Sequence, residues 1–215
     1  MATIAVFGAA GAGGRRIATE ATSRGHDVLS IVRNIERAQA DSRTKVMRGD
    51  GTDVEFITGL AANVDAIVVA VGNPSRSPVL DVAQTMVEAI TSLDSLRPRL
   101  LHMGGGGSLL TPEGTRILDA PNFPPAFLQS ARTQAAALDF YRLHAADCGV
   151  TWTFVSPPPV HFEPGERRGT YRTALDTPVV GKDGKAVLSY EDLAVAMVDE
   201  IENARFLNTR FTAGY

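Results

Sequence analysis

The chain has 215 residues, of which 44% are hydrophobic and 21% charged, and its formal net charge at pH 7 is −3. This composition is ordinary for a globular protein, and it excludes a disordered chain, a collagen-like chain and a small disulfide-stapled scaffold. The charge balance gives no basic surplus for binding nucleic acid or an anionic membrane.

Short apolar runs alternate with longer amphipathic ones. The short runs are too short for helices and favour buried parallel strands; they cover residues 3–7, 28–32, 44–47, 66–71, 99–103, 151–155 and 210–212. Between them, apolar residues at steps of three and four predict helices, most clearly over 79–93 and also over 15–24 and 127–146. The alternation predicts an α/β fold with a doubly wound parallel sheet of about seven strands, as a single domain over residues 1–215.

Two residues are predicted to cap helices. Asp53 precedes an amphipathic segment and is of a type that often begins a helix. Ser189 is followed three residues later by Asp192, which resembles a capping box with Asp in place of the usual Glu or Gln. A last helix is therefore expected directly after Ser189.

The segment GAAGAGG, residues 8–14, directly follows the first predicted strand and directly precedes a predicted helix. Glycines allow a tight turn and a close backbone approach to a pyrophosphate, and the helix N-terminus adds N–H donors and a positive dipole. The segment therefore predicts a dinucleotide site; a glycine-rich turn without a ligand is the alternative interpretation. The expected cofactor contacts here are Gly8, Ala10, Gly11, Ala12, Gly13 and Gly14.

The end of the second predicted strand indicates which dinucleotide binds. An acidic residue about 20 residues beyond the glycines would bind the ribose hydroxyls of NAD. Here Arg33 stands 19 residues after Gly14, and an arginine can pair with the 2′-phosphate of NADP. We expect NADP(H) in preference to NAD(H), with Arg37 as a second candidate contact; a solvated surface cation is the alternative for Arg33.

Further cofactor contacts are expected where the third, fourth and fifth strands end. The segment after the third strand lies where such sheets contact adenine, and a small residue after the fourth lets ribose and pyrophosphate pass. The glycines at 104–107 are expected to leave flat space over the nicotinamide. The contacts predicted at these ends are Asp50, Gly51, Val71, Gly72, Met103 and Gly104.

Residues 156–185 interrupt the alternation with proline- and glycine-containing turns and only short strand-like pieces. Loops of this length in a compact domain are usually functional or mobile. This one follows the sixth strand, on the side where open sheets bind ligands. It predicts a substrate-side loop, in which Arg167, Arg168 and Tyr171 could cover a planar anionic substrate; a surface loop with solvated side chains is the alternative.

These residues together resemble the atypical short-chain dehydrogenase/reductase superfamily, in its NmrA-like, NAD(P)H-binding branch. The chain is most similar to the NADH-flavin reductases of that branch, which are also similar to biliverdin reductase B. The resemblance spans essentially the whole chain and implies a Rossmann-like fold, a nicotinamide cofactor and flavin reduction. Its motifs are FGAAGAGG (7–14), IVRN (31–34), GD (49–50), MGGGGSL (103–109), WTFVSP (152–157), EPGER (163–167), SYED (189–192) and FTAGY (211–215).

The chain departs from that superfamily in its expected catalytic pair. Typical members carry Tyr-x-x-x-Lys on the helix before the sixth strand, with Tyr as general acid and Lys lowering its pKa. This chain has three lysines, and the residues four positions before them are Asp41, Pro178 and Gly181, so the motif is absent. The remaining catalytic candidates are Ser108 and Arg132; a structural loop serine and a surface charge are the respective alternatives.

The sequence therefore favours an NAD(P)H-dependent oxidoreductase that transfers hydride to a flavin or quinone-like acceptor. A conjugated ring spreads the negative charge that arrives with the hydride. The reduction of a ketone, by contrast, is accelerated roughly 10²–10⁴-fold by a positioned acid. The alternative is a non-catalytic NAD(P)H-binding redox sensor or regulatory protein. The expected partner is a small planar acceptor, with no nucleic acid, membrane or metal, and the chain is expected to be a monomer or homodimer.

Two further features concern the cellular setting. The single Cys148 excludes an internal disulfide, which favours a reducing, cytoplasmic location. No apolar run approaches the roughly 20 residues of a membrane span, and the first eight residues lack the basic start of a signal peptide.

Overall fold

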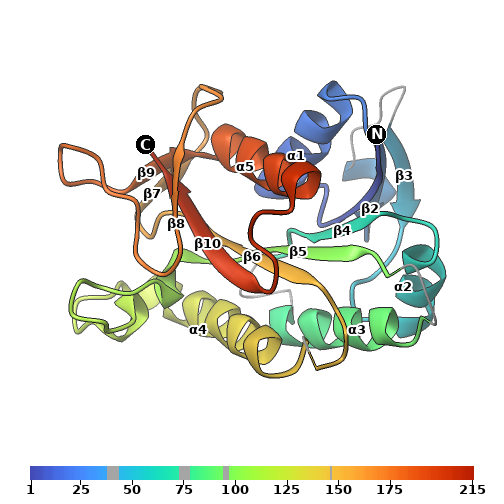
Figure 1. The fold of residues 1–215 in the computed structure, drawn as a ribbon, viewed down its shortest axis with the longest axis horizontal. Coiled ribbons are helices and arrows are strands. Elements are labelled where there is room, and N and C mark those ends of the chain that lie inside the picture. The colour runs from blue at the N-terminus through green and yellow to red at the C-terminus, as the bar shows by residue number, and fades with distance from the viewer. Residues whose placement is uncertain (38–43, 73–77, 94–96, 146) are drawn as a thin grey trace.

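A mostly parallel central sheet forms the middle layer of the molecule (Figure 1). The computed structural model describes residues 1–37, 44–72, 78–93, 97–145 and 147–215. In these residues the sheet has eight strands in the order β3-β2-β1-β4-β5-β6-β10-β8, and β7 and β9 form a separate parallel pair. The strands are β1 (Thr3–Phe7), β2 (Asp27–Val32), β3 (Thr44–Arg48), β4 (Ala66–Val69), β5 (Arg99–Met103), β6 (Trp152–Ser156), β7 (His161–Glu163), β8 (Arg172–Ala174), β9 (Val187–Ser189) and β10 (Thr209–Gly214).

The predicted doubly wound sheet is confirmed. Each of the seven expected strands is present within two residues of its expected bounds, and these seven are the parallel part of the sheet. The sequence did not predict β7, β8 and β9. Each has three residues, and β8 pairs antiparallel with β10 at the sheet edge, where a strand needs no continuous apolar run.

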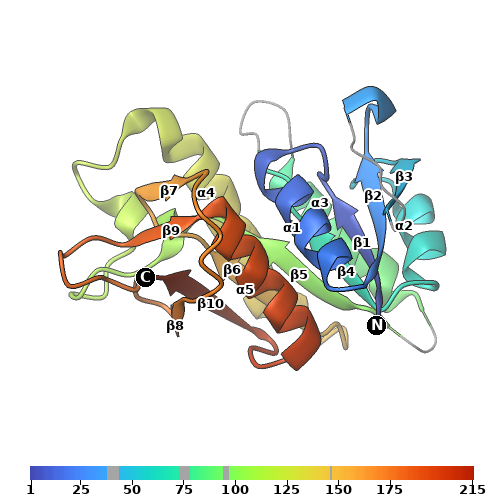
Figure 2. The ribbon, with the colours of Figure 1, turned by 90° about the horizontal axis from the view of Figure 1, so that it is seen from above.

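Helices cover both faces of the sheet. Figure 1 shows α1 and α5 on one face and α2, α3 and α4 on the other, and Figure 2 shows α1 and α5 side by side. The apolar stripe predicted over 79–93 is buried in the core on the α3 side, with Val82 and Met86 at its centre. The helices are α1 (Ala12–Ser23), α2 (Val54–Ala61), α3 (Val79–Thr91), α4 (Pro125–Phe140) and α5 (Tyr190–Asn203), with short helical turns η1 (Ile35–Arg37), η2 (Gly106–Ser108), η3 (Ile117–Asp119) and the π-helical η4 (Tyr141–Ala145).

The order of strands creates a switch point between β1 and β4. The chain moves from β1 outward through β2 and β3, then returns to the other side of β1 with β4. The two strands pair in parallel, with Phe7 opposite Val69 near their carboxyl ends. Connections leave in opposite directions here, and open α/β sheets have their ligand crevice at this point.

Both predicted helix caps are present, but the capping box is incomplete. Asp53 Oδ1 accepts from the backbone N–H of Phe56 at 3.0 Å, and Ser189 Oγ accepts from that of Asp192 at 3.0 Å. In a capping box the Asp192 carboxylate would bind the N–H of Ser189. That N–H instead donates to the hydroxyl of Tyr215 at 3.3 Å, so the prediction was wrong for this half.

The Asp192 carboxylate anchors the long loop instead. It is fully buried, and it accepts from the N–H groups of Arg168 at 3.1 Å and Gly169 at 2.8 Å and from the hydroxyl of Tyr215 at 2.5 Å. One side chain thus joins α5, the loop and the last strand region.

In the described parts of the chain, no helix combines the length and apolar character needed to span a membrane.

Candidate functional site

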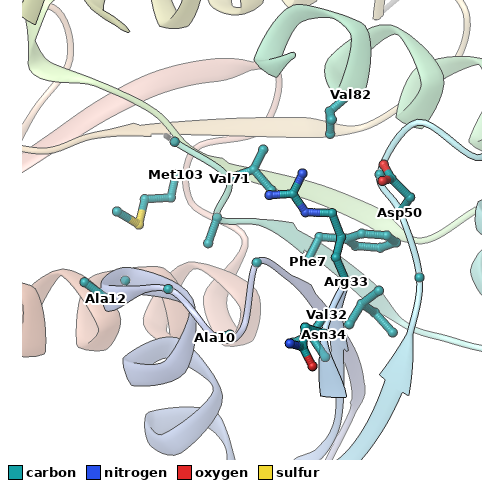
Figure 3. A pocket seen from close by; sticks show the side chains of 18 of the residues that line it. Phe7, Ala10, Ala12, Val32, Arg33, Asn34, Asp50, Val71, Val82 and Met103 are labelled. Carbon is teal, nitrogen blue, oxygen red and sulfur yellow. The ribbon is translucent and has the colours of Figure 1, made fainter. Parts of the chain in front are cut away.

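A pocket of about 680 Å³ lies at the carboxyl ends of β1, β2, β4 and β5 (Figure 3). It joins the glycine segment, the end of β2 and the switch point into one cavity. Of the predicted cofactor residues, Gly14 and Gly104 do not line it. Those that do are Gly8, Ala10, Gly11, Ala12, Gly13, Arg33, Asp50, Gly51, Val71, Gly72 and Met103.

The glycine segment turns tightly between β1 and α1. Gly8 has a φ of +80°, and a Cβ there would lie 2.5 Å from the carbonyl oxygen of Ala70. The Gly8 N–H donates to Ile31 O at 3.2 Å, and the N–H of Gly11 closes the turn onto Gly8 O at 2.9 Å. Gly14 lies behind the turn, where a Cβ would be 2.3 Å from Gly8 O, so this glycine lets α1 pack on the loop.

The N-terminus of α1 is left open toward the pocket. Its N-cap is Gly11, with no side-chain hydrogen bond, and its first turn contains no acidic residue. The first N–H groups of a helix have no acceptor within the helix, and they carry the positive end of its dipole. Ala12 and Gly13 of this first turn line the pocket, so the fold presents donors and positive potential to an anion there.

Two of the residues predicted to bind the adenosine half, Arg33 and Asp50, line the pocket. Figure 3 shows Arg33, directly after β2, reaching into the pocket toward Val71. Asp50 also lines this region; its Oδ1 accepts from the N–H and hydroxyl of Thr52 at 3.0 and 2.9 Å. The side chain of Arg37 lies outside the described part of the chain.

The other end of the pocket contains an aromatic side chain that the sequence analysis missed. Tyr190, the first residue of α5, lines the pocket together with Met103. Its ring lies 4.0 Å from that of Phe162 on β7 and 5.4 Å from the guanidinium carbon of Arg16. The only sequence signal was its place in the SYED motif, which was interpreted as a helix cap and as one motif of the resemblance, without a role for Tyr190 itself.

The glycines at 104–107 do not leave flat space, contrary to the sequence-based expectation. A Cβ at Gly104 would lie 1.9 Å from the ring of Phe154, and one at Gly106 would lie 2.6 Å from Pro157 O. At Gly107 it would meet Ala131 at 2.8 Å. These glycines are needed because β6, the following loop and α4 pack directly against the backbone.

The two catalytic candidates lie away from the pocket lining. Ser108 is 5% exposed on η2, and its hydroxyl accepts from the buried guanidinium of Arg210 at 3.3 Å. The same guanidinium binds Asp176 of the long loop through Nε at 2.9 Å and also through Nη2. Arg132 is exposed on α4. The structure brings neither side chain to the cavity walls.

Part of the long loop is tied to the outer face of α1 and α5. Arg167 binds the Glu20 carboxylate with two hydrogen bonds of 2.7 Å, and the hydroxyl of Tyr171 donates to Asp199. The hydrogen bonds from Arg167, helped by those from Arg24, hold the pKa of Glu20 below its ordinary value against the opposing effect of burial. Arg167 and Tyr171 thus bind carboxylates, and neither side chain lines the pocket.

Potential metal ligands are dispersed over the part of the chain that the structure describes. In the described residues, no three His, Cys, Asp or Glu side chains are grouped as a metal ion would require. The donors around the pocket include backbone N–H groups of α1 and the guanidinium of Arg33. Such donors suit the phosphates of a dinucleotide, so the residues present fit this cofactor.

Comparisons with known proteins agree with this assignment. The NAD(P)H-binding family model matches residues 8–204. The uncharacterized protein YwnB of Bacillus subtilis is 34% identical over 211 residues, which cover 97% of this chain and 96% of that protein.

Two solved structures are similar over essentially their whole length. A "putative exported protein" from Burkholderia pseudomallei is 33% identical, with a TM-score of 0.88 and full coverage of both chains. A "putative NADH-flavin reductase" from Streptococcus pneumoniae is 32% identical, with a TM-score of 0.86 and coverage of 100% of this chain and 99% of that one.

These matches confirm the resemblance found in the sequence, including its Rossmann-like fold and its oxidoreductase relatives. The family match covers the glycine segment, strands β2–β9 and helices α1–α5, and it leaves out only β1 and β10 among the described strands. It supports a nicotinamide cofactor as the ligand class. The chain belongs to the NAD(P)H-binding family.

Proposed function

We propose that the protein is an NADPH-dependent reductase that passes hydride to a flat conjugated acceptor, a flavin or a quinone. The observation that carries the proposal is the single pocket that contains both the uncapped N-terminus of α1 and the side chain of Arg33. When bound, NADPH supplies the hydride. The protein's own residues bind the dinucleotide, orient it and hold the acceptor.

The preference for NADPH depends on charge. The uncapped first turn of α1 is placed to bind the pyrophosphate through backbone N–H groups. Arg33 lies at the end of β2, where NAD-binding sheets carry an acid, and its planar fork of donors suits a 2′-phosphate. NAD(H) offers no phosphate at this position, so it would leave Arg33 without this contact.

The choice of acceptor depends on how the negative charge that the hydride brings to the acceptor is stabilised. The chain lacks Tyr-x-x-x-Lys, and Ser108 and Arg132 lie outside the pocket lining. A flavin or quinone spreads the charge over its ring and can take its proton from solvent, so the protein's task is to bring two flat rings together. Tyr190 and Met103 offer an apolar surface for this at the pocket end remote from Arg33.

Steady-state NADPH oxidation tests the proposal, with free FMN, FAD, a small quinone and a set of simple ketones as acceptors. We expect turnover with at least one flavin or quinone and little with the ketones. Efficient ketone reduction with inert flavins and quinones would show that the protein supplies an acid and that the acceptor is wrongly assigned.

The second candidate is a redox sensor in which the bound dinucleotide sets a conformation that another protein recognises. One observation favours it: the loop expected to cover a substrate is held on α1 and α5 by Glu20 and Asp192. The same assay separates the two functions. Tight NADPH binding without oxidation by any acceptor supports the sensor.

A further inference from the structure

Gln134 is the residue of α4 that bridges the carboxyl ends of β4 and β5. Its side chain is 6% exposed. A Cβ at Gly105, just after β5, would lie 3.3 Å from its Cβ, and a Cβ at Gly72, just after β4, would lie 3.6 Å from its Nε2. The side chain therefore runs from one strand end to the other, directly behind the pocket.

The carboxamide of Gln134 is poorly satisfied for a buried group. Its Nε2 donates to Val71 O over a long 3.4 Å, and its Oε1 has no hydrogen-bond partner in the described residues. A glutamine amide can donate two hydrogen bonds and accept two. Buried polar side chains in native proteins normally find their partners, and exceptions often mark a site with a ligand or a functional role.

The core beside this amide contains a buried cluster of rings. His102 lies beside it, stacked on Phe154 at 5.0 Å and joined through Nδ1 to the hydroxyl of Tyr141 at 3.0 Å. Burial lowers the pKa of His102 to about 3, and the adjacent Gln134 amide opposes this shift. The hydrogen bond to Val71 O points Nε2 of Gln134 toward Val71, which lines the pocket.

Gly72 leaves an opening between the pocket and this donor. Gly72 lines the pocket, and among the described residues other than Gly72 and its two chain neighbours, the only heavy atom within 4 Å of its would-be Cβ is Nε2 of Gln134. Any other residue at position 72 would fill this space with a side chain. At Gly72, therefore, no side chain separates the pocket from a buried hydrogen-bond donor.

We propose that Gln134 is a positioning residue that donates a hydrogen bond to an acceptor oxygen on the nicotinamide riboside half of NADPH. The inference rests on the proposed cofactor site. The first turn of α1 is assigned the pyrophosphate and Arg33 the adenosine phosphate, so the end at Gly72 and Met103 is left for the nicotinamide half. In the described residues, Gln134 is the only residue of α4 whose side chain lies within 4 Å of the would-be Cβ atoms of both Gly72 and Gly105.

The test compares two ligands that share the adenosine half. NADPH has the nicotinamide half, and adenosine 2′,5′-bisphosphate lacks it. Dissociation constants for both are measured with wild type, Gln134→Met and Gln129→Met, the last changing an exposed glutamine of the same helix. For Gln134→Met we expect NADPH to bind about three- to tenfold more weakly, as for one lost hydrogen bond. Affinity for the bisphosphate should stay unchanged, and Gln129→Met should match wild type.

The outcomes separate this inference from the cofactor proposal. If wild type binds neither ligand, the cofactor site itself is wrong. If wild type binds NADPH and Gln134→Met binds both ligands as wild type does, or weakens both equally, Gln134 acts only in packing and the inference is wrong. Should Gln134→Met not fold, Gln134→Asn keeps a buried amide but withdraws it by one methylene, and the same selective loss for NADPH is expected.

Discussion

Arg33 is the residue whose charge should decide between the two nicotinamide cofactors. We expect Arg33→Ala to weaken NADPH binding by about tenfold or more, because a hydrogen bond to a charged group contributes roughly 1.5–3 kcal/mol. NADH binding should change little, since NADH has no 2′-phosphate. Fluorescence titration of both reduced cofactors measures this.

Arg132→Ala provides the matched control, because Arg132 is an exposed arginine outside the pocket lining. This variant should bind both cofactors as wild type does. Equal affinity of the wild-type protein for NADH and NADPH would remove Arg33 from the specificity argument.

Gly8 combines an unusual backbone conformation with a close approach to a neighbouring strand end. Gly8→Ala should lower the free energy of unfolding, since alanine at φ +80° is strained by about 1–2 kcal/mol and its Cβ would also meet Ala70 O at 2.5 Å. Gly184→Ala measures the backbone strain alone, so the difference between the two variants isolates the clash with Ala70 O. Gly184 has a φ of +78° with open space around its would-be Cβ.

Urea denaturation of the two variants checks this prediction. Gly8→Ala should be clearly less stable than Gly184→Ala, and it should also lose NADPH affinity because the turn displaces the first turn of α1. Similar unfolding free energies for the two variants would mean that backbone strain alone, and not the contact with Ala70, requires the glycine.

The glycines also show where residue types stop being informative. A glycine that faces a ligand and one that admits a neighbouring side chain look the same in a sequence. Gly11 lines the pocket, Gly14 and Gly104 make room for Gly8 O and Phe154, and Gly13 does both, because a Cβ there would lie 2.4 Å from Met103 Sδ. Spacing therefore predicted the glycine loop, but only the packing separates these roles.

At the scale of elements, the first turn of α5 contains a residue, Asp192, that holds distant chain segments. Asp192→Ala should detach the segment at Arg168 and Gly169, because their N–H groups would lose a buried acceptor, a loss that costs about 1–3 kcal/mol for each unsatisfied group. Trypsin should then cleave after Arg167 and Arg168 faster than in wild type. Limited proteolysis followed by mass spectrometry measures the rate.

Asp53→Ala is the control for that experiment. Asp53 also caps a helix, α2, but it lies on the other face of the sheet and contacts no part of the long loop among the hydrogen bonds that the structure describes. It should reduce stability by about 1 kcal/mol and leave cleavage at 167–168 unchanged. Equal acceleration in both variants would assign the effect to global destabilisation.

Element bounds were largely predictable, but the partners of element ends were not. Ser189 was identified from its local spacing, and its cap is present. Asp192 three residues later satisfied the same local pattern, yet its partners come from positions 168, 169 and 215. A pattern four residues long carries no information about such distant partners, and Tyr190 between them was missed for the same reason.

At the scale of the whole molecule, the parallel sheet could be predicted because burial on both faces makes each strand a continuous apolar run. Strands β1 and β4 are almost entirely buried. The position of the long loop could not be predicted, because it depends on ion pairs across the chain, such as Arg167 with Glu20, which are 147 positions apart. In a sequence, a charged loop residue looks the same whether its side chain faces a carboxylate, a ligand or water.

The buried His102 should make global stability depend on pH. Burial lowers its pKa from 6.5 to about 3, so the folded protein keeps this imidazole neutral where the unfolded chain takes up a proton. The unfolded state therefore binds more protons as pH falls below 6.5, and the stability present at neutral pH is lost toward pH 3. The slope from this one group is about 1.4 kcal/mol per pH unit.

His102→Gln removes this titration. At pH 7 the variant should be less stable than wild type, because it loses the ring contacts with Phe154 and the hydrogen bond with Tyr141. The two unfolding free energies should converge as the pH falls from 7 to 4, whereas His161→Gln, which changes an exposed histidine of β7, should run parallel to wild type. Urea titrations at intervals of half a pH unit measure this difference, in which the carboxylate titrations common to all three proteins cancel. A constant gap between wild type and His102→Gln would show that the folded protein protonates His102 as readily as the unfolded chain does.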